Sequence, residues 1–204
     1  MIVSIRTFQP AEASNLAQAL AEAFLDNPLN CAVIDRGPRA RLRVNRAGMD
    51  LTLDSAREVA RILTVFAEDD QLAGGLIAVP PGGWPLPPPS FSQQLFGLFR
   101  QGFRVTSRWG RVYSELALKH PGEPHWYLST LGIHPRYQRR GLASALLDYW
   151  LREVAAAREG AYLETDHPES LSFYLKRGFR VCEECRLFGV PIWRMSRSAD
   201  FLSS

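Results

Sequence analysis

The chain has 204 residues, of which 46% are hydrophobic and 22% are charged, as in ordinary water-soluble globular proteins. This length suits one domain with a substantial core, so we expect residues 1–204 to form a single domain. The net charge of +3, without a lysine-rich run or basic residues interleaved with aromatics, argues against a nucleic-acid partner.

The first third of the chain predicts a strand followed by two helices. Residues 2–8 alternate apolar and polar side chains, as a strand does. Pro10 opens a helix that we expect Pro28 to end, and residues 39–53 predict a second, partly buried helix. The first helix places its apolar side chains on one face: Leu16, Ala17, Leu20, Ala21, Phe24 and Leu25.

A hairpin and an unusual insertion follow. Residues 59–66 and 72–79 predict two antiparallel strands. The proline-rich run at 80–89 suits neither helix nor strand, because proline lacks the backbone donor and fixes φ. We expect helical segments over 91–118, broken near Gly102 and at Trp109-Gly110, within an insertion spanning about residues 80–124. Its aromatic side chains are expected to pack inside the protein: Phe91, Phe96, Phe99, Phe103, Trp109 and Tyr113.

The junction near Gly141 has the features of an anion site. An apolar strand at 126–133 precedes it, and a helix with an apolar stripe follows it. Gly141 lacks a Cβ, so an anion can approach the backbone N–H groups at the helix start, where the helix dipole favours negative charge. Arg136, Arg139 and Arg140 add positive charge. These features predict a site for a diphosphate.

The remaining segment predicts a strand, a short helix and a closing hairpin. Residues 161–165 form the strand, and a turn at His167-Pro168 leads into a two-turn helix that Gly178 caps. Residues 179–188 and 190–195 predict an antiparallel pair around Gly189. The tail from Ser196 is polar and is expected to fray.

Two motifs in this region resemble those of the GCN5-related N-acetyltransferase (GNAT) family. Gln138-x-x-Gly141-x-Ala143 resembles the family's pyrophosphate loop, and Phe173-Tyr174-x-x-x-Gly178-Phe179 resembles its second hallmark. A Rossmann site would need G-x-G-x-x-G, and this loop has one glycine. Within the family, the chain looks closest to the puromycin N-acetyltransferase group.

The resemblance implies an α/β (α+β) fold of the GNAT type. Its central sheet is mixed, mostly antiparallel, with about seven strands and helices on both faces. The strands at 126–133 and 161–165 are expected to splay apart.

The resemblance also implies acetyl-CoA as co-substrate. Main-chain groups of Leu131 and Ile133 would bond the pantetheine arm, and the Leu131 N–H would stabilise the oxyanion. Tyr174 matches the family's general acid. His167 and Ser170 stand where the family usually has asparagine. The implied coenzyme-binding residues are Leu131, Gly132, Ile133, Gln138, Arg139, Arg140, Gly141, Leu142, Ala143, Ser144, Ser170 and Tyr174.

The general base stays open. Glu164 lies on the strand beside the splay, where some relatives carry a catalytic glutamate, but it could equally form a structural ion pair. Glu123, His120 and His125 precede the central strand and compete with it. An ordered water, used by many relatives, is a further alternative.

Other chemistry is not expected. Cys182 and Cys185 would point to opposite faces of one strand, and no second pair completes a zinc site, so we expect neither a metal nor a disulfide framework. The odd cysteine number suits a reducing cytoplasm. No signal peptide or bilayer-spanning stretch is expected, and hence no membrane partner.

The sequence therefore predicts an acetyl-CoA-dependent N-acetyltransferase that acts on a small-molecule amine by direct attack on the thioester. Two alternatives remain: a coenzyme-binding regulatory module without turnover, and a protein or peptide N-acetyltransferase. The insertion would crowd an extended peptide groove, which favours the small molecule. A monomer or a homodimer would suit this function.

Overall fold

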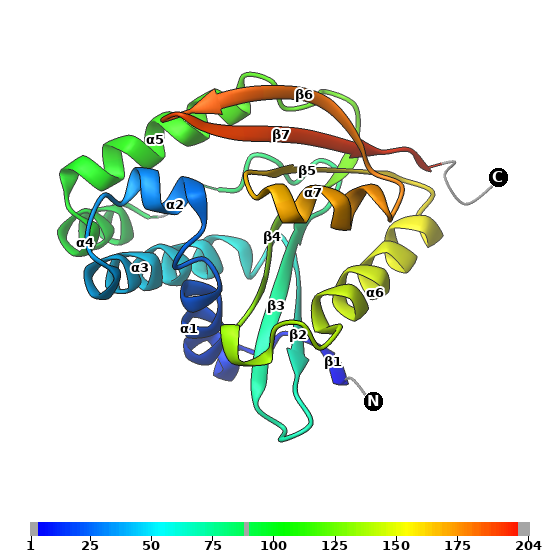
Figure 1. Cartoon of the computed structure of the whole chain (residues 1–204), viewed down its shortest axis with the longest axis horizontal. Helices are drawn as coiled ribbons and strands as arrows, with labels where there is room; N and C mark the ends of the chain where they lie inside the picture. Colours follow the sequence, from blue (N-terminus) through cyan, green and yellow to red (C-terminus); the bar gives the residue numbers. More distant parts are fainter. Residues whose placement is uncertain (1–3, 88–89, 200–204) are drawn as a thin grey trace.

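In the computed structural model, which describes residues 4–87 and 90–199, seven strands form one sheet (Figure 1). Their order across the sheet is β1-β2-β3-β4-β5-β7-β6. All neighbouring strands are antiparallel except β4 and β5, which are parallel. This arrangement confirms the predicted mixed, mostly antiparallel sheet. The strands are β1 (Ser4–Thr7), β2 (Arg61–Phe66), β3 (Leu72–Val79), β4 (His125–Ile133), β5 (Gly160–Thr165), β6 (Arg180–Leu187) and β7 (Val190–Arg197).

Helices cover both faces of this sheet, as predicted. On one face, α1 (Ala13–Ala23) and α3 (Pro38–Ala56) bury Leu16, Leu20 and Leu53 against Ile62 and Ile77. α6 (Leu142–Ala156) and α7 (Pro168–Leu175) cover the other face. They pack against the strand side chains that point away from α1 and α3, since successive residues of a strand point to opposite faces. This second core includes Leu63, Leu76, Leu128, Leu146, Leu147, Trp150, Leu163 and Phe179.

A short helix, α2 (Pro28–Val33), was not predicted. α1 ends at Ala23, and Pro28 opens α2 instead of ending α1, as proline does at a first helical position. The Asn27 side chain caps α2 by accepting a hydrogen bond from the Asn30 N–H at 3.1 Å. The prediction that the first helix reaches Pro28 was therefore wrong.

The insertion contains two helices, α4 (Phe91–Gln101) and α5 (Phe103–Ala117). The predicted break at Gly102 is confirmed, because this residue adopts φ +86° and ends α4. The predicted break at Trp109-Gly110 is wrong, since α5 continues through it. A glycine inside a helix costs about 1 kcal/mol. Burial of Val105, Trp109 and Val112 against α2 and the β6–β7 hairpin outweighs that cost.

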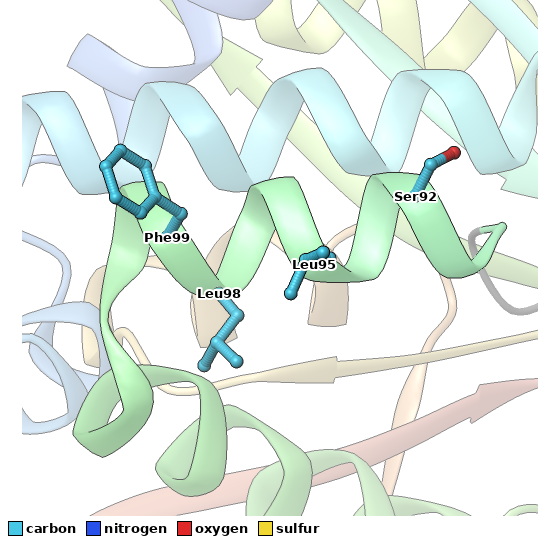
Figure 2. Close-up of a pocket in the computed structure, with 4 residues that line it drawn as sticks. All are labelled: Ser92, Leu95, Leu98 and Phe99. Atoms are coloured by element: carbon cyan, nitrogen blue, oxygen red, sulfur yellow. The ribbon is translucent and has the colours of Figure 1, made fainter.

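The insertion's aromatic side chains were expected inside the protein, and for four of them this is wrong. Phe91, Phe99 and Phe103 are 82%, 87% and 78% exposed, and Tyr113 is also exposed. α4 approaches α3 through Gly97, where a Cβ would collide with Leu51, so its large side chains lie on other faces. Ser92, Leu95, Leu98 and Phe99 line an open apolar depression on α4 (Figure 2). Trp109 does pack inside, and the Phe96 side chain lies outside the described residues.

The C-terminal strand is longer than predicted. β7 continues through Ser196 to Arg197, which is buried and donates from Nε to the Arg177 carbonyl at 3.1 Å. The expected fraying from Ser196 is therefore wrong, because this segment pairs with both β5 and β6. Residues 2–3 of the predicted first strand, 88–89 of the proline run and 200–204 of the tail lie outside the described residues. Over the described ranges, no helix is long and apolar enough to span a membrane.

Close packing of α1 on β4 depends on Gly132. A Cβ there would lie 2.9 Å from Leu20 Cδ2, 3.0 Å from Phe24 Cε2 and 3.1 Å from the Ala23 Cβ. We expect Gly132→Ala to destabilise the fold by about 1–3 kcal/mol, the usual cost of overpacking. Gly48→Ala is the matched control: no atom lies within 4 Å of its Cβ, and alanine should stabilise α3 by about 0.5–1 kcal/mol. Urea unfolding of both variants measures the difference, and equal effects would contradict the close approach.

Candidate active site

The central feature of the sheet is a gap between β4 and β5. The two strands pair only from His125–Leu128 on β4 and Gly160–Leu163 on β5, and then separate. At the point of separation, the register of β4 with β3 shifts, so that Ser129 is an extra, bulged residue between Leu128 and Thr130. The later residues of β4 thus have β3 on one side and the gap on the other. This confirms the predicted splay.

Main-chain groups of Leu131 and Ile133 face this gap. The His134 N–H donates to the Ala73 carbonyl on β3 at 2.8 Å. Because hydrogen-bonding groups of successive residues in a strand point to opposite edges, those of Ile133 and Leu131 point away from β3. Gln138 was predicted to bind coenzyme, but its side-chain amide donates to the Ile133 carbonyl at 2.9 Å. This hydrogen bond holds the loop against β4. The main-chain groups of Leu131 and the N–H of Ile133 remain available on the side of the gap.

The loop near Gly141 ends at the uncapped start of α6. Gly141 is the N-cap residue, with φ +76°, and no side chain among the described residues caps the helix. The first hydrogen bond of α6 runs from the Ala145 N–H to the Gly141 carbonyl, at 2.9 Å. The N–H groups of Leu142, Ala143 and Ser144 precede it and therefore have no acceptor within the helix. Arg139 also has positive φ, at 62°, and Arg136, Arg139 and Arg140 are all exposed. This geometry suits a diphosphate.

Tyr174 lies on α7, on the face of the sheet that α6 covers. Its ring packs edge-on against Phe173 and Phe179 and is only 9% exposed. Burial raises the pKa of the Tyr174 hydroxyl above its usual value, and the nearby Arg177 guanidinium opposes this rise only in part. The hydroxyl therefore stays protonated at neutral pH, as a general acid requires. Ser170 lies one turn earlier on α7, and its N–H donates to the His167 carbonyl at 2.9 Å.

Glu164 lies on β5 just beyond the last residue that pairs with β4, and its side chain is on the opposite face from Leu163. Burial raises the pKa of the Glu164 carboxyl, while the hydroxyls of Tyr127 and Tyr162 and the Arg194 guanidinium act in the other direction. Glu164 Oε1 is buried without a hydrogen-bond partner in the described structure. The expected alternative, a structural ion pair with arginine, is not formed: Arg194 pairs with Glu183 at 2.7 Å instead.

The competing base candidates lie elsewhere. Glu123 is exposed in the turn before β4. His120 and His125 contact each other at the amino end of β4, with 3.1 Å between their Nε2 atoms. Burial, and secondarily the neighbouring His125, lower the pKa of His120 to about 4. Of the four side chains, Glu164 is the one beside the gap.

The face that carries Glu164 is covered by α2 and α5. The Asp166 carboxylate, at the end of β5, accepts from Asn27 Nδ2 and from the Leu29 N–H, both at 2.7 Å. Arg194, the cross-strand neighbour of Glu164, donates to the Glu115 carbonyl on α5 at 3.0 Å. Sequence reasoning did not identify Asp166 or Arg194, because only the fold brings segments so distant in sequence together.

Within the described residues, no three His, Cys, Asp or Glu side chains form a group that could hold a metal ion. Cys182 is exposed and its Sγ lies 2.9 Å from Ser196 Oγ, whereas Cys185 packs against the cluster under α5. All three cysteines are unpaired.

A family comparison agrees with this geometry. Residues 37–179, more than half of the chain and including both β4 and α7, match the model of the acetyltransferase (GNAT) family. The chain belongs to the GNAT family. It is accordingly an acetyltransferase, with the sheet and helices of GNAT proteins.

Solved acetyltransferase structures share this fold over almost their whole length. The histone acetyltransferase HPA2 and related acetyltransferase from Corynebacterium glutamicum has a TM-score of 0.74 at 19% identity, over 97% of each chain. Arylalkylamine N-acetyltransferase 2 from Aedes aegypti has a TM-score of 0.65 at 14% identity, over 98% of this chain and 100% of that one. The PaiA N-acetyltransferase from Thermoplasma acidophilum, solved with coenzyme A, has a TM-score of 0.59 at 15% identity, over 97% and 99%.

Proposed function

We propose that this GNAT protein transfers the acetyl group of acetyl-CoA to the amine of a small molecule, with the whole chain acting as one domain. One observation carries the proposal. The Leu131 main-chain groups and the Ile133 N–H face the gap between β4 and β5, and Glu164 lies where this gap opens. The uncapped start of α6 follows β4 in the chain, and the helix that carries Tyr174 follows β5. Tyr174 and Glu164 approach from opposite faces of the sheet.

Each group has a distinct part in this chemistry. The thioester of the co-substrate supplies the activated acetyl group. The N–H groups at the start of α6 and the nearby arginines hold the diphosphate. The Leu131 N–H donates to the carbonyl oxygen as it gains negative charge. Glu164 takes a proton from the acceptor ammonium, and Tyr174 gives a proton to the departing thiolate. The remaining expected contacts, by Gly132 and Ser170, would position the pantetheine arm.

The acceptor would approach on the face of Glu164, because α6 and α7 occupy the other face. The helices α2 and α5 lie on that side (Figure 1). Hydrogen bonds hold them to Asp166 and Arg194. Because these helices restrict the room for an extended peptide, this arrangement favours a small amine as the acceptor. The resemblance to the puromycin N-acetyltransferase group supports the same class of acceptor. The unpaired cysteines suit the reducing cytoplasm that we propose as its location.

A test of the overall function is direct. We expect steady release of coenzyme A thiol from acetyl-CoA in the presence of a suitable small amine, drawn from a broad panel of aryl and alkyl amines. Coenzyme binding without turnover on the whole panel would favour a regulatory module. Turnover confined to peptides or proteins would assign a protein acceptor.

Glu164→Gln tests the base. We expect kcat to fall by roughly 10²-fold or more while affinity for acetyl-CoA stays the same, because the carboxylate acts on the amine alone. In the native enzyme, kcat should rise with pH through the raised pKa of Glu164, and the variant should lose this rise.

Glu164→Gln should raise the stability of the fold even though it lowers kcat. A carboxyl whose pKa is raised by folding favours the fold below its unfolded pKa, and this contribution is lost as pH rises through the folded pKa. Glu164→Gln should therefore stabilise the protein at neutral pH.

A variant with wild-type kcat and an unchanged pH profile would exclude Glu164 as the base.

A further inference from the structure

The chain between α1 and α2, residues 24–29, joins the two strands that border the gap. At its start, the Phe24 ring packs against β4, with Cε2 3.0 Å from the position that a Cβ of Gly132 would take. At its end, the Asp166 carboxylate, which directly follows β5, accepts from Asn27 Nδ2 at 2.7 Å. Both contacts lie beyond the paired part of β4 and β5. Residues 24–29, which we name the crossing segment, therefore span the gap.

The crossing segment lies on the face of the sheet from which the acceptor amine would approach. It connects α2 with α1, whose apolar side chains cover the face opposite α6. Asp166 follows Glu164 by two residues, and alternate residues of an extended chain point to the same side. Gly132 lies between Leu131 and Ile133, whose main-chain N–H groups face the gap. The crossing segment therefore covers the place where an amine would meet the thioester.

A hydrogen-bond network fixes the first half of the crossing segment to α3. Asn30 and Asn45 are both buried, at 6% and 4% exposed. Asn30 Nδ2 donates to the Phe24 carbonyl at 3.0 Å and to Asn45 Oδ1 at 3.1 Å. Arg41 Nε donates to the Leu25 carbonyl at 2.6 Å. Because Arg41 and Asn45 both belong to α3, this half of the segment is held independently of β5.

Asp166 fixes the second half of the segment to the end of β5. Its carboxylate also accepts from the Leu29 N–H at 2.7 Å, a donor at the start of α2 that has no acceptor within the helix. Hydrogen bonds to an ionised group are about twice as strong as those between neutral groups. The Asn27 amide cannot turn over to replace them, because its Oδ1 already accepts from the Asn30 N–H at 3.1 Å. The position of this half therefore depends on the carboxylate.

We propose that Asp166 is a positioning residue, which sets the binding site of the acceptor amine by holding the crossing segment over the gap. This inference rests on the proposed function. Asp166 does not touch the reacting atoms and acts through Asn27 and Leu29. When the segment is held, it forms one wall of the acceptor site. When it is released, the amine loses that wall, while Glu164 and the Leu131 N–H keep their places.

Asp166→Asn tests this role. The new amide can present only one oxygen, so Asn27 Nδ2 and the Leu29 N–H no longer both find an acceptor. We expect KM for the amine to rise about tenfold and kcat to stay within about threefold, because the wall is lost and the reacting groups are not. Affinity for acetyl-CoA should stay the same, since the proposed diphosphate site is at the start of α6.

Two further variants separate the hydrogen bonds from charge and from general destabilisation. Asp26→Asn is the matched control: it removes a carboxylate from the same segment, but Asp26 is exposed and pairs with Arg41 at 2.9 Å, so KM should stay native. Asn27→Asp alone places two carboxylates together and should raise KM as Asp166→Asn does. In the double variant the new amide donates to the new carboxylate, which still caps α2, and most of the native KM should return.

Amide hydrogen exchange at Leu29, followed by NMR, tests the same contact without turnover. We expect exchange at least about tenfold faster in Asp166→Asn, and native rates in Asp26→Asn and in the double variant. Native exchange at Leu29 in Asp166→Asn would overturn the inference, whether or not the protein turns over any amine, which separates this result from a failure of the proposed function. An unchanged amine KM in Asp166→Asn, or additive losses in the double variant, would also overturn it.

Discussion

Tyr174→Phe is expected to lower kcat by roughly 10²-fold, the usual scale for one general acid, while acetyl-CoA affinity changes by no more than a few-fold. The phenyl ring can keep the edge-on contacts with Phe173 and Phe179, so the fold should remain intact. Only the hydroxyl proton is lost. Steady-state kinetics with acetyl-CoA and an amine measure kcat, and calorimetry measures the affinity.

The pH dependence sharpens this prediction. Because burial raises the pKa of Tyr174, the native hydroxyl stays protonated through the neutral range. The variant should therefore be slow at every pH between about 6 and 9, instead of losing activity on one side only. Tyr149→Phe is a suitable control, since it removes a tyrosine hydroxyl on α6. Turnover near the native rate would mean that solvent, and not Tyr174, protonates the thiolate.

Gly141→Val should weaken acetyl-CoA binding at least about tenfold, which corresponds to about 1.4 kcal/mol. Gly141 adopts φ +76°, a region that a β-branched residue avoids, so valine would shift the backbone at the start of α6. Its side chain would also project into the open space where the diphosphate is proposed to lie, since no protein atom is within 4 Å of a Cβ there. Calorimetric titration with coenzyme A measures the effect.

Backbone strain alone must be separated from loss of the site. Gly189, in the turn between β6 and β7, offers a matched control because it has φ +81° and an equally open Cβ position. Gly189→Val should lower stability by a similar amount and leave coenzyme affinity unchanged. If both variants bind coenzyme A as the native protein does, the α6 start is not the diphosphate site.

The local patterns predicted most elements where a single segment carries the signal. The apolar stripe of α6, the short apolar run of β3 and the positive-φ glycines at 102 and 178 each depend on neighbours within a few residues. The two motifs also placed Gly141 and Tyr174 next to the strands that border the gap. Where local rules failed, as at Trp109-Gly110, the packing of a whole helix face outweighed the propensity of one residue.

Other features depend on which distant segments meet, and only the tertiary structure decided them. The bulge at Ser129 and the end of β4–β5 pairing after Leu128 arise from strand registers that no local pattern specifies. The pairing of β5 with β7 places Arg194 beside Glu164, and the loop before β4 brings His120 against Tyr162. The sequence by itself determined which residue types were available for the chemistry. Long-range strand pairing and helix packing decided which of them share a buried environment, and hence which pKa values are shifted.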